Sequence, residues 1–209
     1  MLLTLVPAMG VTALAATYPN SVELYNRNGT ITSLSDGQCL VTNDGSATSY
    51  TGGSSYVARY DQSSGTLYLN DYHGAATDGQ IYAHGDLNIE VVSDSSFSTS
   101  VSATNNLYGI QANGTLKISG SGKLTVTANG KGDVYGIYAK EGVTISAPLD
   151  VKVGKNSATE NGPVYGIYTK SGAISLSGND MTVTATGGTS AAYGVYNAAN
   201  TSTAITNNG

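Results

Sequence analysis

The residues best suited to chemistry in this chain are its two histidines. His73 stands in "NDYHG" and His84 in "AHGDL", and each lies two residues from an aspartate. Asp71, Asp78 and Asp86 are therefore close enough in sequence to pair with them as an acid/base group. Each aspartate also neighbours a Gly, Asn or Tyr, a setting typical of turns. Turn formation explains the aspartates without catalysis, so we predict no catalytic residues.

Other chemical motifs are missing from the sequence. It has no D-x-D-x-D-G loop, calcium-binding nonapeptide repeat, H-E-x-x-H, G-x-S-x-G or phosphate-binding loop. The single cysteine, Cys39, excludes an intrachain disulfide and a cysteine-based metal cluster. We expect no metal site and no cofactor, with a calcium site in "TNDGS" (Thr42 to Ser46) left open.

A tyrosine-rich block recurs through the second half of the chain. "VYGIYAKEG" begins at Val134 and "VYGIYTKSG" at Val164, and a fainter copy, "GQIYAHG", begins at Gly79. Recurrence at a nearly fixed spacing indicates a repeat protein. The Tyr-Gly-Ile or Tyr-Gly-Val triplets start 27 to 30 residues apart, at Tyr108, Tyr135, Tyr165 and Tyr193.

Each repeat contains three short runs in which apolar and polar residues alternate, separated by Gly, Ser, Asn or Pro. Alternation with a period of two is typical of β-strands. Three strands per repeat without a helical segment predict an all-β, right-handed parallel β-solenoid over residues 79–209, with one coil per repeat. A sandwich of antiparallel hairpins would explain the number of strands, but not the return of the same side chains at the same phase.

Residues 16–78 lack the repeat and predict an N-terminal cap with the first strands. Two hairpin patterns are present, "VELYNRNGTITSL" with its Asn-Gly turn and "YVARYDQSSGTLYLNDY" with its Ser-Gly turn. A solenoid exposes unpaired strand edges at its ends, and hairpins can cover such an edge.

The two ends of the chain carry further expectations. Residues 1–15 form an apolar run that ends in the A-x-A pattern of a signal peptide, although the positive segment that normally precedes such a run is missing. The alternative is a buried N-terminal strand or helix. The last residues, "TAITNNG", stop where a second strand should continue, so we expect a truncated C-terminus. An exported chain would be secreted or attached to the cell wall or cell surface.

Alternation within the block predicts which side chains face the core. The aliphatic position, occupied by Ile137 in one copy, must face inward, so Tyr135 and Ala139 should do the same. Gly136 and Tyr138 should then face outward. The copy with Gln111 at the Tyr138 position supports this phase, because a glutamine is costly to bury without partners. This predicts an inner tyrosine row in the core and an outer row beside a row of glycines.

The predicted outer row would form a shallow trough walled by rings, which could stack on the apolar faces of sugars while lysines bond sugar hydroxyls. The alternative is that neighbouring tyrosines only pack on one another and stabilise the coils. The predicted glycan-binding residues are Tyr82, Tyr138, Tyr168, Tyr196, Gly136, Gly166, Lys140 and Lys170.

The segments "SSGTLYLNDYHG", "IYAHGDLNIEV" and "LYGIQANGTLKISGSGKLTVTA" resemble secreted or cell-wall proteins of Gram-positive anaerobes, described as carbohydrate-binding-domain or right-handed β-helix proteins of the pectin-lyase-like type. The resemblance covers about residues 55–209. It implies a surface location and a role in glycan binding or adhesion. Enzymes of that type place carboxylates at one phase of successive coils, beside a basic residue. The acids of these repeats share no phase and no arginine lies among them, which argues against lyase or hydrolase activity.

Together these patterns predict a non-enzymatic extracellular protein that binds a polysaccharide or a host or cell-wall glycan. A net charge of −5 without a dense basic stripe makes nucleic acid an unsuitable partner. Membrane insertion is not expected once the signal is removed. The alternatives are a passive stalk or spacer of a larger adhesin and, second, a divergent polysaccharide lyase or hydrolase.

Overall fold

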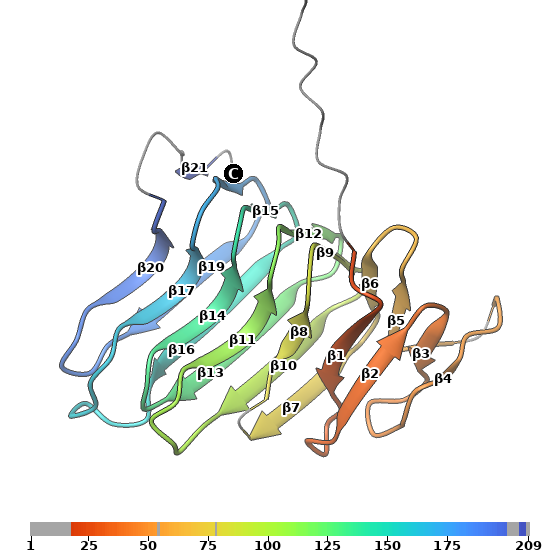
Figure 1. The fold of residues 1–209 in the computed structure, drawn as a ribbon, viewed down its shortest axis with the longest axis horizontal. Coiled ribbons are helices and arrows are strands. Elements are labelled where there is room, and N and C mark those ends of the chain that lie inside the picture. Colours follow the sequence, from red (N-terminus) through yellow and green to blue (C-terminus); the bar gives the residue numbers. More distant parts are fainter. Residues whose placement is uncertain (1–17, 54, 78, 200–204, 208–209) are drawn as a thin grey trace, which may run out of the picture.

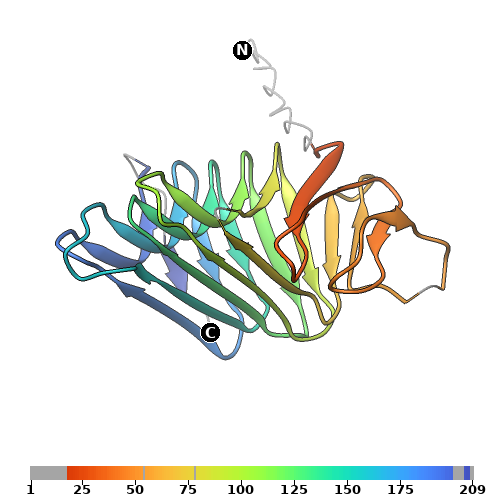
Figure 2. The same cartoon turned by 90° about the horizontal axis from the view of Figure 1, so that it is seen from below.

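The computed structural model describes residues 18–53, 55–77, 79–199 and 205–207. Within these residues the chain forms strands and loops and no helix. The strands belong to three sheets that wind into stacked coils along the long axis of the molecule, with the N-terminal hairpins at one end (Figures 1 and 2). The prediction of a β-solenoid is confirmed. The predicted signal peptide lies outside the described residues.

Sheet A contains the tyrosine blocks and lies in front in Figure 1. Its neighbours from β8 to β20 are parallel, whereas β1 pairs antiparallel with both β2 and β8. The register sets Tyr108 opposite Tyr135 and Ile110 opposite Ile137, so the blocks stack in phase. In spatial order the strands are β2 (Ile31–Ser35), β1 (Ser21–Tyr25), β8 (Ile81–Ala83), β11 (Leu107–Ala112), β14 (Val134–Ala139), β17 (Val164–Thr169) and β20 (Ala192–Asn197).

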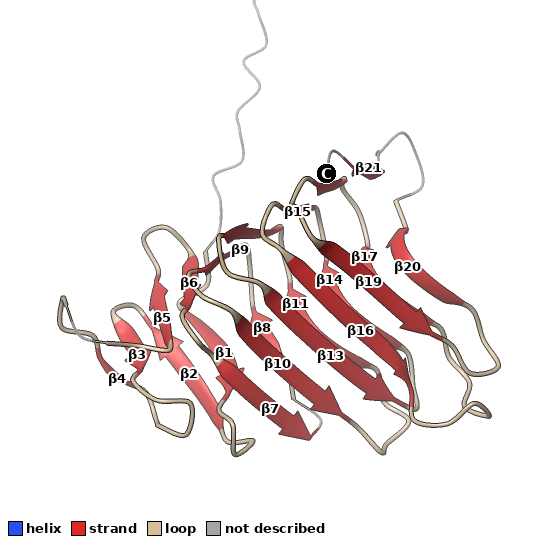
Figure 3. Ribbon diagram, turned by 180° about the vertical axis from the view of Figure 1, so that it is seen from behind, coloured by secondary structure: helices blue, strands red, loops and turns tan. Residues whose placement is uncertain are grey.

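Sheet C forms the opposite side of the solenoid and lies in front in Figure 3. All its strands are parallel. Its outward positions hold mainly Ser and Thr, because strands such as "LTVTANG" alternate a buried aliphatic with a polar residue. In spatial order the strands are β7 (His73–Thr77), β10 (Ser95–Ser100), β13 (Leu124–Gly130), β16 (Leu149–Lys155) and β19 (Met181–Thr186).

Sheet B closes the third side of the coils. Its strands are parallel from β21 to β6 and antiparallel from β6 to β4, where the sheet continues into the cap. In spatial order the strands are β21 (Ile205–Asn207), β18 (Ile174–Leu176), β15 (Val143–Ile145), β12 (Leu116–Gly120), β9 (Leu87–Val91), β6 (Thr66–Leu69), β5 (Ala58–Asp61), β3 (Gln38–Leu40) and β4 (Thr48–Ser49).

Each complete coil contributes one strand to each sheet, as β11, β12 and β13 do in turn. The three alternating runs of a repeat are therefore its three strands, and the aliphatic side chains of all three meet inside the coil. Ile110, Ile118 and Val126 come from the three strands of one coil and are fully buried. Because the coils stack, these layers form one continuous aliphatic core. Burial of each such side chain contributes roughly 1.5–3 kcal/mol.

The N-terminal hairpins cover the edges that the first coils would expose. The β1–β2 hairpin turns at Gly29 (φ 77°) and the β5–β6 hairpin at Gly65 (φ 61°), a left-handed conformation that glycine adopts without strain. β1 lies along β8 and so pairs the free edge of sheet A. The buried Tyr60 hydroxyl donates a 2.7 Å hydrogen bond to the Pro19 carbonyl and ties the two hairpins together. Both predicted hairpins are confirmed.

Candidate functional surface

Seven tyrosines stand in two rows along sheet A. Within each row the rings are nearly parallel. In the first row the ring centroids of Tyr108 and Tyr135 are 4.9 Å apart, and those of Tyr135 and Tyr165 are 5.0 Å apart. In the second row the centroids of Tyr138 and Tyr168 are 5.4 Å apart. These seven residues, which we call the tyrosine surface, are Tyr108, Tyr135, Tyr165 and Tyr193 in the first row and Tyr138, Tyr168 and Tyr196 in the second.

Both rows lie on the same side of sheet A. The Tyr135 and Tyr138 rings meet edge to face at 5.6 Å with an interplanar angle of 84°, and Tyr135 meets Tyr168 at 5.2 Å and 78°. Rings on opposite faces of one strand could not touch in this way. The Tyr135 side chain is 9% exposed, because other tyrosines cover it and not because it enters the aliphatic core. The prediction that the first row faces the core is wrong.

The glycines of the blocks occupy the inward positions instead. A Cβ at Gly136 would lie 2.5 Å from Val151 Cγ1 and 2.8 Å from Val153 Cγ1, both on β16 across the core. A Cβ at Gly166 would lie 2.2 Å from Val183 Cγ1. Gly136 and Gly166 were predicted to line the outer trough, and this placement is wrong.

The physical reason is a local break in the alternation of the strand. Gly136 and Ile137 are consecutive residues, and both are buried on the core side. The register pairs Tyr135 with Tyr165 and Ile137 with Ile167 and omits the glycine between them, so the ladder is interrupted at the same place in both strands. Only a residue without a Cβ fits where the backbone presses against the valines of sheet C. Because one extra residue is turned inward, both tyrosines of the block emerge on the outside.

The rings of the tyrosine surface therefore follow two regular arrangements. Rings are offset and parallel along each row and tilted steeply between rows, the two arrangements that aromatic pairs favour. Each ring is therefore covered in part by its neighbours in the same row and in the other row. Burial, together with neighbouring tyrosines, raises the pKa of Tyr138, Tyr165 and Tyr168 above the ordinary value. These hydroxyls stay protonated and keep a hydrogen to donate.

The two predicted lysines lie at one end of this surface. Lys140 and Lys170 are exposed and directly follow β14 and β17. Their backbone N–H groups bond the carbonyls of Ala112 and Ala139 in the preceding coils, at 3.0 and 3.1 Å. The lysines therefore occupy equivalent, exposed positions in adjacent coils.

Tyr82 belongs to a separate polar cluster. Its hydroxyl accepts a 2.7 Å hydrogen bond from Asn113 Nδ2 and lies 3.2 Å from His84 Nδ1, while its ring meets the His84 ring at a centroid distance of 4.5 Å. Gln111 occupies the intervening position between Tyr82 and Tyr138 in the register. The structure therefore keeps Tyr82 on sheet A but outside the stacked rows.

The histidine and aspartate candidates do not form one group. His73 lies between Asp71 and Ser96, with Nε2 3.0 Å from Asp71 Oδ1 and Nδ1 2.8 Å from Ser96 Oγ. Asp86 instead accepts hydrogen bonds from the backbone and hydroxyl of Thr115, at 2.7 and 2.9 Å. Asp78 lies outside the described residues. Sequence reasoning missed Ser96, which stands 23 residues from His73 and meets it only because β7 and β10 are adjacent.

The segment left open for calcium forms a tight turn in the cap. The Gly45 N–H bonds the Thr42 carbonyl at 3.1 Å, and Asn26 Nδ2 donates to the Gly45 carbonyl at 3.3 Å. Over the described residues, no group of three or more His, Cys, Asp or Glu side chains gathers at one point. In the same part of the chain, no helix has the length and apolar character needed to cross a membrane.

In comparisons with known proteins, no family model, no curated protein and no solved structure matches this chain.

Proposed function

We propose that this protein binds carbohydrate through the tyrosine surface of sheet A. The observation that supports the proposal is the concentration of seven tyrosines on one outer face, in register over four coils. Rows of aromatic side chains at a protein surface usually mark an interaction site. Phenol rings combine an apolar ring with a hydroxyl group and suit a ligand that offers both hydroxyls and apolar C–H faces, and sugars have that character.

The spacing of the rows suits an extended polysaccharide. Ring centroids repeat every 4.9 to 5.4 Å along the first row and 5.4 to 5.7 Å along the second. This is close to the length that one sugar adds to an extended chain, so successive sugars would meet successive coils in equivalent ways. Protonated tyrosine hydroxyls would donate to sugar oxygens, and Lys140 and Lys170 would bond the chain where it leaves the rows.

The proposal includes an extracellular location. The apolar run that ends in Ala13-Leu14-Ala15 supports export, since this pattern is typical of a signal-peptide cleavage site. The ligand would then be a polysaccharide or a host or cell-wall glycan, and the protein would be secreted or attached at the cell surface. Detection of the protein in the culture medium or the cell-wall fraction, with a new N-terminus near Ala16, tests this part.

Binding is tested by retention of the purified chain on insoluble cellulose, chitin, xylan and cell-wall glycan, with glycan arrays for soluble ligands. The double variant Tyr138→Phe/Tyr168→Phe keeps the ring packing and removes two hydroxyls. We expect each lost hydroxyl to weaken binding about 2- to 12-fold, the equivalent of roughly 0.5–1.5 kcal/mol. Tyr68→Phe, on sheet B, is the matched control and should bind as the parent does.

Two outcomes would contradict the proposal. Retention that is unchanged in the double phenylalanine variant, and also in Tyr138→Ala/Tyr168→Ala with its fold intact by circular dichroism, would move the binding site elsewhere. Failure of the parent chain to bind any of these glycans would favour the alternative, a stalk or spacer in which the stacked tyrosines serve only to hold the coils together.

A further inference from the structure

We propose that Asp71, His73 and Ser96 form a nucleophilic acyl-transfer site on the outer face of sheet C, with small carboxylic esters as its substrate class. The site lies on the opposite side of the solenoid from the tyrosine surface (Figures 1 and 3), and it does not depend on carbohydrate binding. The three side chains have the chemical types and the mutual contacts of a nucleophile, a base and a group that orients the base.

The geometry forms a continuous hydrogen-bonded series. His73 and Ser96 are direct partners in the parallel register of β7 and β10, and Ser96 Oγ lies 2.8 Å from His73 Nδ1. The other ring nitrogen, Nε2, lies 3.0 Å from Asp71 Oδ1. A carboxylate at Nε2 holds the proton on that nitrogen, which leaves Nδ1 free to accept the hydrogen of the serine hydroxyl.

The residue between the acid and the base anchors both. Tyr72 is fully buried, and its hydroxyl donates to the Tyr25 carbonyl. Its backbone N–H bonds Ser95 Oγ at 3.1 Å, and its carbonyl accepts from the Ser96 N–H at 2.7 Å. The start of β7 and the start of β10 are thus fixed to each other directly before the His73–Ser96 contact, as a preorganised site requires.

A second anchor comes from the cap. Asn43 Oδ1 accepts the His73 N–H at 2.6 Å, and Asn43 Nδ2 donates to the Asp71 carbonyl at 2.9 Å. Asp71 itself has a φ of 59°, in the left-handed region that non-glycine residues seldom adopt. The cap therefore holds the aspartate in a conformation that the isolated segment would avoid, and this conformation brings its carboxylate to the histidine.

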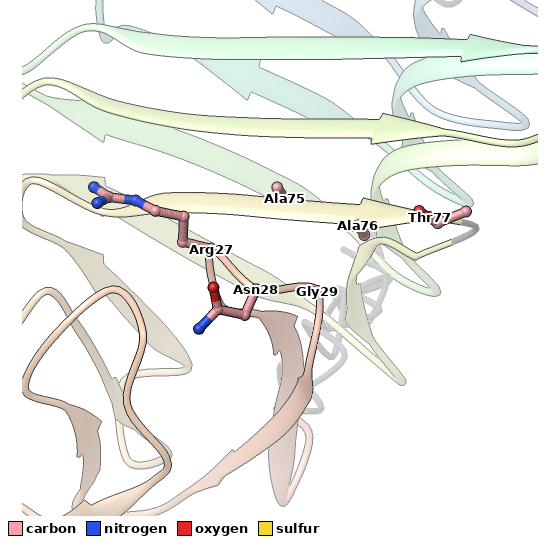
Figure 4. A pocket seen from close by; sticks show the side chains of 6 residues that line it. All are labelled: Arg27, Asn28, Gly29, Ala75, Ala76 and Thr77. Carbon is pink, nitrogen blue, oxygen red and sulfur yellow. The ribbon is translucent and has the colours of Figure 1, made fainter.

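A small hollow lies along β7 between this strand and the Arg27–Gly29 turn, and Asp71, His73 and Ser96 are not among its lining residues. It has a volume of about 190 Å³ and lies over the outward Ala75, two residues from His73 on the same face of β7. Arg27 lines it, and Figure 4 shows the Arg27 side chain extending along the strand away from Thr77. The Arg27 backbone N–H bonds the Asn43 carbonyl at 2.7 Å, so the same asparagine positions the arginine.

These groups perform ester hydrolysis with water as the second reactant. Ser96 Oγ adds to the ester carbonyl carbon while its proton passes to His73 Nδ1, and the carbonyl oxygen takes the negative charge. The C–O bond to the alcohol then breaks, and the alcohol oxygen takes the proton from Nδ1. Water next attacks the acyl-serine, His73 accepts a water proton and returns it to Ser96 Oγ, and the carboxylic acid leaves.

The test uses the purified full chain with two probes. A fluorophosphonate probe reports the nucleophile, and peptide mass spectrometry should place the label on Ser96. Hydrolysis of p-nitrophenyl acetate reports turnover. We expect His73→Gln to lower the rate about 10²- to 10⁴-fold, the range for loss of a general base. Asp71→Asn should lower it less, because the Asp71 side chain is 75% exposed, and asparagine tolerates the same positive φ.

Matched variants separate this site from reactivity spread over the surface. Ser98→Ala changes the next outward hydroxyl of β10, and His84→Gln changes the other histidine; both should keep labelling and turnover. Ser96→Ala should abolish both, with an unchanged melting temperature. Absence of label on Ser96, equal labelling in His73→Gln, or full hydrolysis in Ser96→Ala would each overturn the proposal.

Discussion

Replacement of Gly136 by alanine tests the orientation of the tyrosine blocks. The new methyl group would lie 2.5 Å from Val151 Cγ1, 2.7 Å from the Gly166 carbonyl oxygen and 2.8 Å from Val153 Cγ1. Real Cβ atoms essentially never approach other heavy atoms so closely. The valines could change rotamer, but the Gly166 oxygen belongs to the backbone of the next coil and cannot turn aside. The coils must therefore separate locally or the strand must shift.

The expected loss is about 1–3 kcal/mol of unfolding free energy, the usual cost of overpacking a core. For a chain of this size it corresponds to a fall in melting temperature of about 2–4 °C per kcal/mol. Urea unfolding followed by far-ultraviolet circular dichroism measures it, with a lower midpoint and an unchanged slope as the signature of altered stability.

Two other glycines give matched controls. Gly194 holds the same position of the block in the last tyrosine strand, and its added Cβ would meet no atom nearer than 3.7 Å. Gly142 lies in the same repeat as Gly136, and its nearest contact would be the Ala173 carbonyl oxygen at 3.3 Å, so alanine there needs a small shift and should cost less than at Gly136. Alanine at Gly194 should be neutral or stabilise by up to about 1 kcal/mol, because it reduces the freedom of the unfolded chain. If Gly136→Ala is as mild as Gly194→Ala, the glycine faces solvent and the inferred break in the alternation does not exist.

Three further predictions follow from burial. Ile137→Ala should cost about 2–5 kcal/mol in urea unfolding, because it empties a fully buried position, whereas Ile31→Ala, at a side chain 52% exposed, should change stability by less than about 0.5 kcal/mol. Stability should fall in alkaline solution, because burial raises the pKa of Tyr60 from 10.0 to about 12 and the folded state therefore favours the protonated phenol. This contribution to stability is complete below pH 10 and is lost as the pH rises through 12. A constant melting temperature from pH 9 to 12 would contradict the prediction. Burial also raises the pKa of the Cys39 thiol, so Ellman's reagent should react slowly with the native protein and at once in urea; fast native reaction would place the thiol at the surface.

The solenoid could be predicted from the sequence because it is a local pattern that repeats along the chain. The spacing of the blocks fixed the coil length, the alternation fixed the strands, and the turns at Gly29 and Gly65 marked the hairpins. Each of these signals lies within about 30 residues of chain and does not depend on contacts between residues that are far apart in the sequence. The same locality explains why strand order in the sheets followed directly from coil order.

Which residues of the tyrosine blocks point to the core and which point outward could not be predicted in the same way. Strict alternation assigns Gly136 and Ile137 to opposite faces, whereas the structure turns both inward. The cause is Val151, which belongs to another sheet and presses on the glycine from across the core. A sequence shows that a glycine recurs, but not which distant side chain occupies the space of its missing Cβ. Ser96 escaped notice for a related reason, since its contact with His73 depends on the register of two separate strands.

The most direct measurement of carbohydrate binding at the tyrosine surface is nitration of tyrosines by tetranitromethane, read residue by residue by mass spectrometry, with and without the polysaccharide that retains the protein best. A ligand lying along the rows should slow nitration of Tyr138, Tyr168 and Tyr196 while leaving Tyr56 and Tyr68 of the cap and sheet B unchanged. Equal nitration of the second row in the free and bound protein, or protection confined to Tyr56 and Tyr68, would contradict the assignment of the binding surface to sheet A.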